Sequence, residues 1–80
     1  MPNIGIILEK KLIEVGIDSP DKLIEMGSIE SFLKIRQIER DACLNMLQAL
    51  EGAVQGVRWH FLSKETKNNL LSFYKSLDKG

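Results

Sequence analysis

Apolar side chains recur at helical spacing along most of the chain, and glycine, serine or proline interrupts them at short intervals. This alternation predicts five short amphipathic helices. Neither an internal repeat nor a shift in composition marks a domain boundary within residues 1–80. The pattern therefore predicts a single compact all-α domain of five helices.

The first predicted helix lies between Gly5 and Gly16, where Gly16 is placed to adopt the left-handed conformation that ends a helix. Its inward stripe comprises Ile7, Leu8, Leu12 and Val15. The second helix starts at Ser19-Pro20-Asp21, which supplies an N-cap, a first-turn proline and a carboxylate for the helix dipole. Its predicted apolar face is Leu23, Ile24 and Met26, and Gly27 ends it.

The third helix is expected to be capped by Ser28 and to end near Arg40. Its predicted inward residues are Ile29, Phe32, Leu33 and Ile35. Asp41 is a good N-cap for the fourth helix, which has the clearest period and should be the centre of the core. Its apolar positions are Cys43, Met46, Leu47, Leu50, Val54 and Val57.

Gly52 lies inside this fourth helix, where glycine costs about 1 kcal/mol relative to alanine. A close approach of another backbone would explain it. Together with Ala49, Ala53 and Gly56 it forms a strip of small residues. We expect this strip to seat a neighbouring helix of the same chain rather than a partner.

The segment from Val57 to Leu62 is rich in aromatic residues and is expected to pack across the core. Ser63 caps the last helix, and Lys75 and Lys79 lie near its C-terminus. The buried side of this helix is predicted to be Leu70, Leu71, Tyr74 and Leu77.

Composition narrows the function classes. Eleven basic residues balance eleven acidic ones, so the long-range attraction that most nucleic-acid binders use is missing. The lone Cys43 is expected to be a reduced core residue, and the lone His60 a half-buried structural one. We therefore expect no enzyme activity, metal, cofactor or small-molecule substrate. Without a long apolar run, a cytoplasmic location is expected.

Pro2-Asn3-Ile4-Gly5 predicts a tight turn in which Asn3 replaces glycine at a positive φ. The amides of Gly5, Ile6 and Ile7 would then stand at a helix N-terminus, where the dipole favours a phosphate, and Lys10 and Lys11 would add charge. The alternative is that the turn only starts the helix and Ile4 plugs into the core. Because the turn carries no basic residue, we favour the structural role.

A second candidate contact region is Arg58-Trp59, since arginine and tryptophan are enriched at interface hot spots. Ile4 and Ile6, near the chain start, are the other candidate partner contacts, because exposed isoleucines there need cover from a second copy or another protein.

Taken together, these residues resemble the C-terminal domain of the TfoX/Sxy regulators of DNA transformation competence. The resemblance covers nearly the whole chain and rests on five segments, Pro2-Asn3-Ile4-Gly5, Glu14-Val15-Gly16-Ile17, Cys43-Leu44-Asn45, Ala49-Leu50-Glu51-Gly52-Ala53 and Gly56-Val57-Arg58-Trp59-His60. It implies a stand-alone member with a helix-hairpin-helix, SAM-like fold and a role in transcriptional co-activation or competence.

Two functional hypotheses follow. The first is a regulatory protein-interaction module that binds a protein partner or a second copy of itself. The second is a weak, sequence-independent DNA-binding module that uses the amides of the N-terminal turn.

Overall fold

The computed structural model describes residues 4–78, which form five α-helices and one turn of 3₁₀ helix. The helices are α1 (Ile6–Glu14), α2 (Pro20–Met26), α3 (Ser28–Ile38), α4 (Leu44–Gln55) and α5 (Lys64–Asp78), and the 3₁₀ turn is η1 (Trp59–Phe61). The all-α prediction is confirmed. Within the described residues no helix is long and apolar enough to cross a bilayer.

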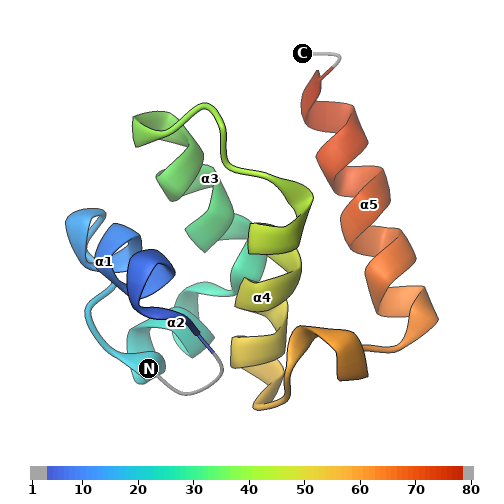
Figure 1. Cartoon of the computed structure of the whole chain (residues 1–80), viewed down its shortest axis with the longest axis horizontal. Coiled ribbons are helices and arrows are strands. Elements are labelled where there is room, and N and C mark those ends of the chain that lie inside the picture. Colours follow the sequence, from blue (N-terminus) through green and yellow to red (C-terminus); the bar gives the residue numbers. More distant parts are fainter. Residues whose placement is uncertain (1–3, 79–80) are drawn as a thin grey trace.

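Helix α4 lies in the middle of the molecule, with α1, α2 and α3 on one side and α5 on the other (Figure 1). It packs against α2, α3, α5 and η1. Leu47 and Leu50 of α4 are completely buried, which confirms the prediction that the fourth helix forms the centre of the core. The other buried apolar residues are Leu12, Ile17, Leu23, Phe32, Ile35, Ala42, Leu62 and Leu70.

Three glycines that the sequence marks as helix ends have a positive φ: Gly16 at +89°, Gly27 at +86° and Gly56 at +76°. The left-handed conformation costs little at glycine because it has no Cβ. Beyond Gly16, the amide of Ile17 donates to the carbonyl of Leu12, and the Ile17 side chain is buried. Each glycine therefore ends its helix as predicted, and after Gly16 the chain folds back onto the core.

The predicted caps of α2 and α5 are present. The Lys22 amide donates to Ser19 Oγ at 3.2 Å, and the Thr66 amide donates to Ser63 Oγ at 3.1 Å. The predicted cap of α3 is wrong, because Gly27 itself precedes the helix and Ser28 is its first residue. The Ser28 hydroxyl instead donates to Glu51 Oε1 of α4 at 2.6 Å.

The start of α4 also differs from the prediction. Asp41 lies in a turn, and Cys43 is the residue that precedes the helix, in an extended conformation. The turn buries Ala42, so Cys43 is carried to the surface, and the prediction of a core cysteine is wrong. The third helix ends at Ile38, before the predicted Arg40.

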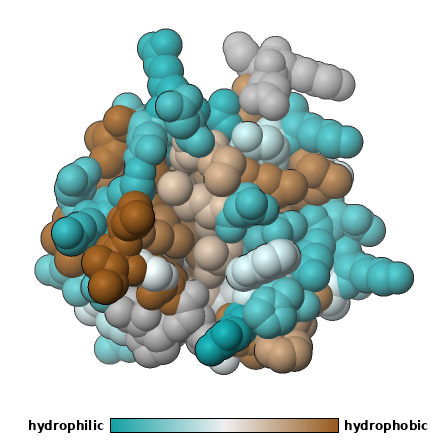
Figure 2. Space-filling model, viewed as in Figure 1, coloured by the Kyte–Doolittle hydropathy of each residue, from teal (hydrophilic) through white to brown (hydrophobic). Residues whose placement is uncertain are grey.

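Three isoleucines predicted to face inward are exposed: Ile7 (74%), Ile24 (53%) and Ile29 (40%). Each is adjacent in sequence to a residue that is more deeply buried, namely Leu8, Leu23 and Ser28. In α2, for example, Leu23 is buried, and a seven-residue helix presents only a narrow face to the interior. Figure 2 shows apolar side chains gathered over α1, where Ile6, Ile7 and Ile13 are exposed.

Candidate interaction surface

The turn after α4 positions the aromatic segment. Gly56 ends the helix, and the amide of Val57 donates back to the carbonyl of Gly52 at 2.8 Å. The chain then passes directly over Gly52, so the predicted close backbone approach at this glycine is confirmed. The approaching backbone, however, belongs to residues 57–59 and not to a neighbouring helix.

The prediction that this segment packs across the core is wrong for its aromatic rings. Only Leu62 is buried, whereas Trp59 is 46% exposed and Phe61 is 71% exposed. A 3₁₀ helix turns by a third of a circle per residue, so three successive side chains point in three directions. The direction toward α4 is occupied by the backbone contact with Gly52, which leaves the rings outside.

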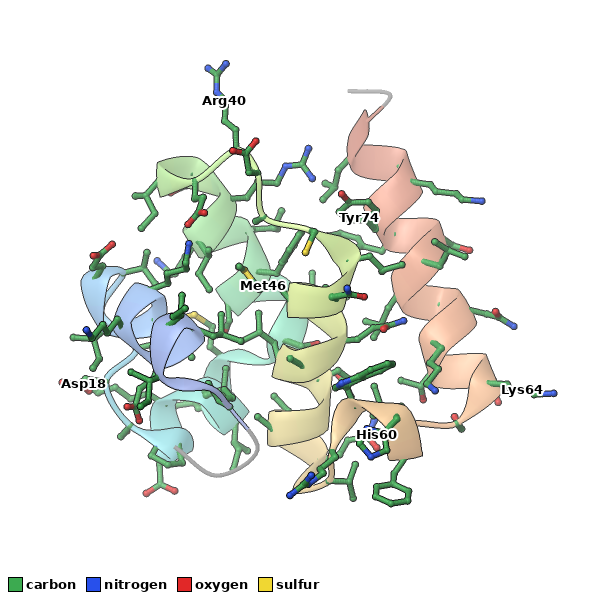
Figure 3. All side chains as sticks on the ribbon, viewed as in Figure 1. Asp18, Arg40, Met46, His60, Lys64 and Tyr74 are labelled. Atoms are coloured by element: carbon green, nitrogen blue, oxygen red, sulfur yellow. The ribbon has the colours of Figure 1, made fainter. Side chains whose placement is uncertain are left out.

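His60 lies where η1 crosses the end of α4 (Figure 3). It is exposed, so the prediction of a half-buried histidine is wrong. Its ring lies 5.5 Å from that of Trp59 at 89° and 4.8 Å from that of Phe61 at 44°. The three rings therefore form one contiguous aromatic cluster at the surface.

Lys67 of α5 contacts this cluster. Its ammonium lies 5.5 Å from the centre of the Trp59 ring and donates to the His60 carbonyl at 3.4 Å. A cation over an indole is attracted by the ring quadrupole, by about 0.5–1 kcal/mol at an exposed site. The sequence does not single out Lys67, although its position one helical turn after Ser63 faces back toward the connector.

A hollow of about 340 Å³ joins this cluster to the start of the chain, lined by Ile4, Arg58, Trp59 and His60. Three of the four predicted partner contacts thus line a single hollow. The fourth, Ile6, is 72% exposed on the first turn of α1. Below, Ile4, Arg58, Trp59, His60 and Phe61 are together called the η1 surface.

The predicted phosphate contact lies at the start of α1. Gly5 precedes the helix in an extended conformation with no side-chain cap, so the first-turn amides of Ile6 and Ile7 have no partner within the helix. Asn3 lies outside the described residues. Lys10 is exposed, but Lys11 is half-buried and forms an ion pair with Glu39, which follows α3. Lys11 is thus held toward α3.

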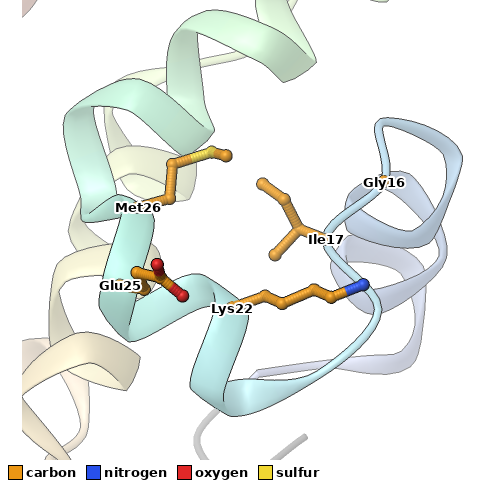
Figure 4. A pocket seen from close by; sticks show the side chains of 5 residues that line it. All are labelled: Gly16, Ile17, Lys22, Glu25 and Met26. Carbon is orange, nitrogen blue, oxygen red and sulfur yellow. The ribbon is translucent and has the colours of Figure 1, made fainter.

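A larger hollow, of about 400 Å³, lies between the end of α1 and α2, and sequence reasoning missed it. Ile17 and Met26 face each other across it, and Lys22 runs along one edge (Figure 4). The Lys22 ammonium is 2.9 Å from Asp18. Its hydrogen bond and its charge both lower the pKa of the Asp18 carboxyl below the ordinary value of 3.8.

Among residues 4–78, no three His, Cys, Asp or Glu side chains gather closely enough to hold a metal ion. Chemistry at the η1 surface is limited to aromatic faces, one apolar side chain and cationic groups. Such a surface is suited to binding.

The family follows from residues 1–74, which match the model of the TfoX C-terminal domain. The chain belongs to the TfoX C-terminal domain family. One relative, DNA transformation protein TfoX1 of Aliivibrio fischeri, is 29% identical over 72 residues. The match covers 89% of this chain and 34% of the relative, so the chain spans about a third of that relative's length.

Two crystal structures share this TfoX C-terminal fold. An uncharacterized protein from Listeria monocytogenes, in a triclinic form, is 47% identical with a TM-score of 0.94 over 98% of this chain and 89% of its own. A protein of unknown function from the same organism, in a tetragonal form, is 49% identical with a TM-score of 0.92 over 95% of this chain and 93% of its own.

Proposed function

We propose that this domain is a non-enzymatic regulatory module that binds a protein partner through the η1 surface. The observation that carries the proposal is the shared hollow, in which Ile4 from one end of the chain meets Arg58 and Trp59. Exposed tryptophan and arginine side chains beside a hollow have the composition of an interface hot spot.

The likeness to DNA transformation protein TfoX1 supports a role for the module in the control of DNA transformation. We place its partner among the proteins that control DNA transformation, in the cytoplasm, where an exposed thiol such as that of Cys43 stays reduced. Gly52 on α4 and Lys67 on α5 both contact η1 and help to position it.

The test is quantitative co-purification from the source cells with the tagged full chain as bait. We expect a defined partner to be captured by the wild-type chain and reduced about tenfold or more by the variant carrying both Arg58→Ala and Trp59→Ala. Ile24→Ser is the control, because Ile24 is a similarly exposed apolar residue on α2. Identical captured sets from all three baits would refute the proposal.

Self-association is the version in which the partner is a second copy. Ile6 and Ile7 are 72% and 74% exposed on α1, and their burial would stabilise such a dimer. Sedimentation equilibrium measures this directly. A dimer that dissociates in the variant with Ile6→Ser and Ile7→Ser would identify the chain itself as the partner. A wild-type chain that stays monomeric at high concentration would exclude self-association, and the partner would then be a different protein.

A second candidate function is weak, sequence-independent DNA binding at the start of α1. The first-turn amides, which have no acceptor within the helix, and the exposed Lys10 favour it, whereas Glu9 in the first turn and the Lys11–Glu39 pair reduce the positive charge available. Its signature would be an affinity for duplex DNA that falls steeply with salt and is lost in Gly5→Glu. Fluorescence anisotropy at low salt measures both, and binding unchanged by Gly5→Glu excludes this site.

A further inference from the structure

The η1 surface combines a hollow, lined by Ile4, Arg58, Trp59 and His60, with the nearby cation Lys67. We infer that it binds an acidic peptide segment of the partner, with one large apolar side chain of that segment inserted between Ile4 and Trp59. The inference rests on the proposed function and specifies the chemistry of its partner.

The charge argument is local. The chain as a whole carries eleven basic and eleven acidic residues, yet residues 58–67 hold three cations against one carboxylate, Glu65. The cations are Arg58, Lys64 and Lys67. Arg58 lines the hollow itself, and Lys67 lies over the Trp59 ring. An acidic segment lying across η1 would therefore meet complementary charge at the hollow, from Arg58, and beside the Trp59 ring, from Lys67.

The acidic group of α4 does not cancel this charge. Glu51 accepts hydrogen bonds from Ser28 Oγ and from Gln55 Nε2, each at 2.6 Å. Its carboxylate is thus bound toward α3 and along its own helix. Arg58, which precedes η1, lines the hollow, and Lys67 of α5 lies over the Trp59 ring.

The volume of the hollow limits how much of the peptide can be inserted. A volume of about 340 Å³ is at the lower end of the about 300–1,000 Å³ that small-molecule sites occupy. It opens to solvent beside Ile4, Arg58 and the Trp59 ring. A site of this kind accommodates one apolar or aromatic side chain, while the rest of the peptide stays on the charged rim.

Aromatic and basic residues together also occur in proteins that bind single-stranded nucleic acid, but the ring geometry here favours a peptide. Base stacking needs ring faces that are open and similarly oriented. The planes of Trp59 and His60 are 89° apart, and Lys67 lies over the Trp59 ring. Rings that point in different directions are better suited to contact a single inserted side chain than to stack with successive bases.

The experiment is a selection from a library of displayed random peptides against the immobilised full chain, followed by fluorescence anisotropy with the enriched peptides. We expect enriched sequences with several Asp or Glu residues around one Trp, Phe, Leu or Met. Binding should weaken about tenfold or more in Arg58→Glu and in Trp59→Ala. Lys34→Glu, the same charge change at an exposed position on α3, should leave it unchanged.

Other outcomes overturn the inference in distinguishable ways. Enriched peptides that are neutral or basic but still require Trp59 would refute the acidic partner and leave the proposed function standing. Peptides that bind Arg58→Glu and Trp59→Ala with the same affinity as the wild type would show that the η1 surface is not their binding site. The co-purification would then test the proposed function separately. Tighter binding of oligothymidylate than of any enriched peptide, lost in Trp59→Ala, would assign the surface to single-stranded nucleic acid.

Discussion

Gly52 and Trp59 are packed backbone against backbone. A Cβ atom on Gly52 would lie 3.0 Å from the Trp59 nitrogen and 3.2 Å from its Cα, and 2.6 Å from the carbonyl oxygen of Val57. Real Cβ atoms do not approach backbone atoms this closely, so only glycine allows η1 to lie on α4. Gly52 weakens its own helix, but it lets the Trp59 backbone pack on α4, and the Trp59 ring then lies at the surface.

Gly52→Ala should therefore displace η1. We expect a net loss of about 1–2 kcal/mol in the free energy of unfolding, because the steric clash outweighs the better helix propensity of alanine. The protein has one tryptophan, so its fluorescence also reports the environment of η1. Denaturant unfolding followed by fluorescence measures both, with the exposed Asn45→Ala of the same helix as control. Unchanged stability together with an unchanged spectrum would contradict the proposed constraint.

The helices were predictable because their signals are local. A helical period needs only the residues of its own segment, and the stops at Gly16, Gly27 and Gly56 depend on backbone conformation that few other residues adopt cheaply. The side chain that faces inward was less predictable. Leu23 and Ile24 are adjacent and equally apolar, and only the position of α4 decides that Leu23 is buried.

The candidate site was predicted in its parts but not in its arrangement. Arg58 and Trp59 were selected for their residue types, and Ile4 for its place near the chain start. That all three line a single hollow depends on how the fold brings Ile4 next to residues 58 and 59, which no local pattern encodes. The exposure of Phe61 is equally non-local, since an apolar segment predicts burial unless the turn that carries it is known.

The hydrogen bond between Ser28 and Glu51 joins α3 to α4 from a buried hydroxyl. Glu51→Ala leaves that hydroxyl without its acceptor, so we expect a loss of about 1–3 kcal/mol in the free energy of unfolding. Ser28→Ala in addition should cost less than the sum of the two single changes, because the donor that needs a partner is gone. Urea unfolding of the two single variants and the double variant gives the coupling, and strict additivity would contradict a direct bond.

The ion pair between Asp18 and Lys22 predicts a small pH dependence of stability. Because the folded-state pKa of Asp18 is below its ordinary value of 3.8, the folded protein binds fewer protons there than the unfolded chain. The pair therefore stabilises the fold above pH 3.8, and its contribution is lost as the pH falls through the folded-state pKa. Lys22→Ala should raise the pKa of Asp18 toward 3.8, as measured by NMR titration of the carboxyl carbon. Both side chains are exposed, so the change in stability should be slight.

Phe32 and Phe61 provide a matched pair that separates folding from binding. Phe32 is completely buried and its ring lies 6.1 Å from that of Tyr74, so Phe32→Ala removes core packing between α3 and α5. We expect it to cost about 3–5 kcal/mol in the free energy of unfolding. Phe61 is 71% exposed, so Phe61→Ala should change stability by no more than about 0.5 kcal/mol.

Binding should respond in the opposite order. If the aromatic cluster on η1 contacts the partner, Phe61→Ala weakens capture although the protein remains fully folded, because the His60 ring loses its neighbour and the partner loses apolar contact area. Thermal unfolding and co-purification on the same preparations make the comparison. A Phe61→Ala protein that is destabilised as much as Phe32→Ala would show that η1 belongs to the core, and the exposed rings would then lose their role in recognition.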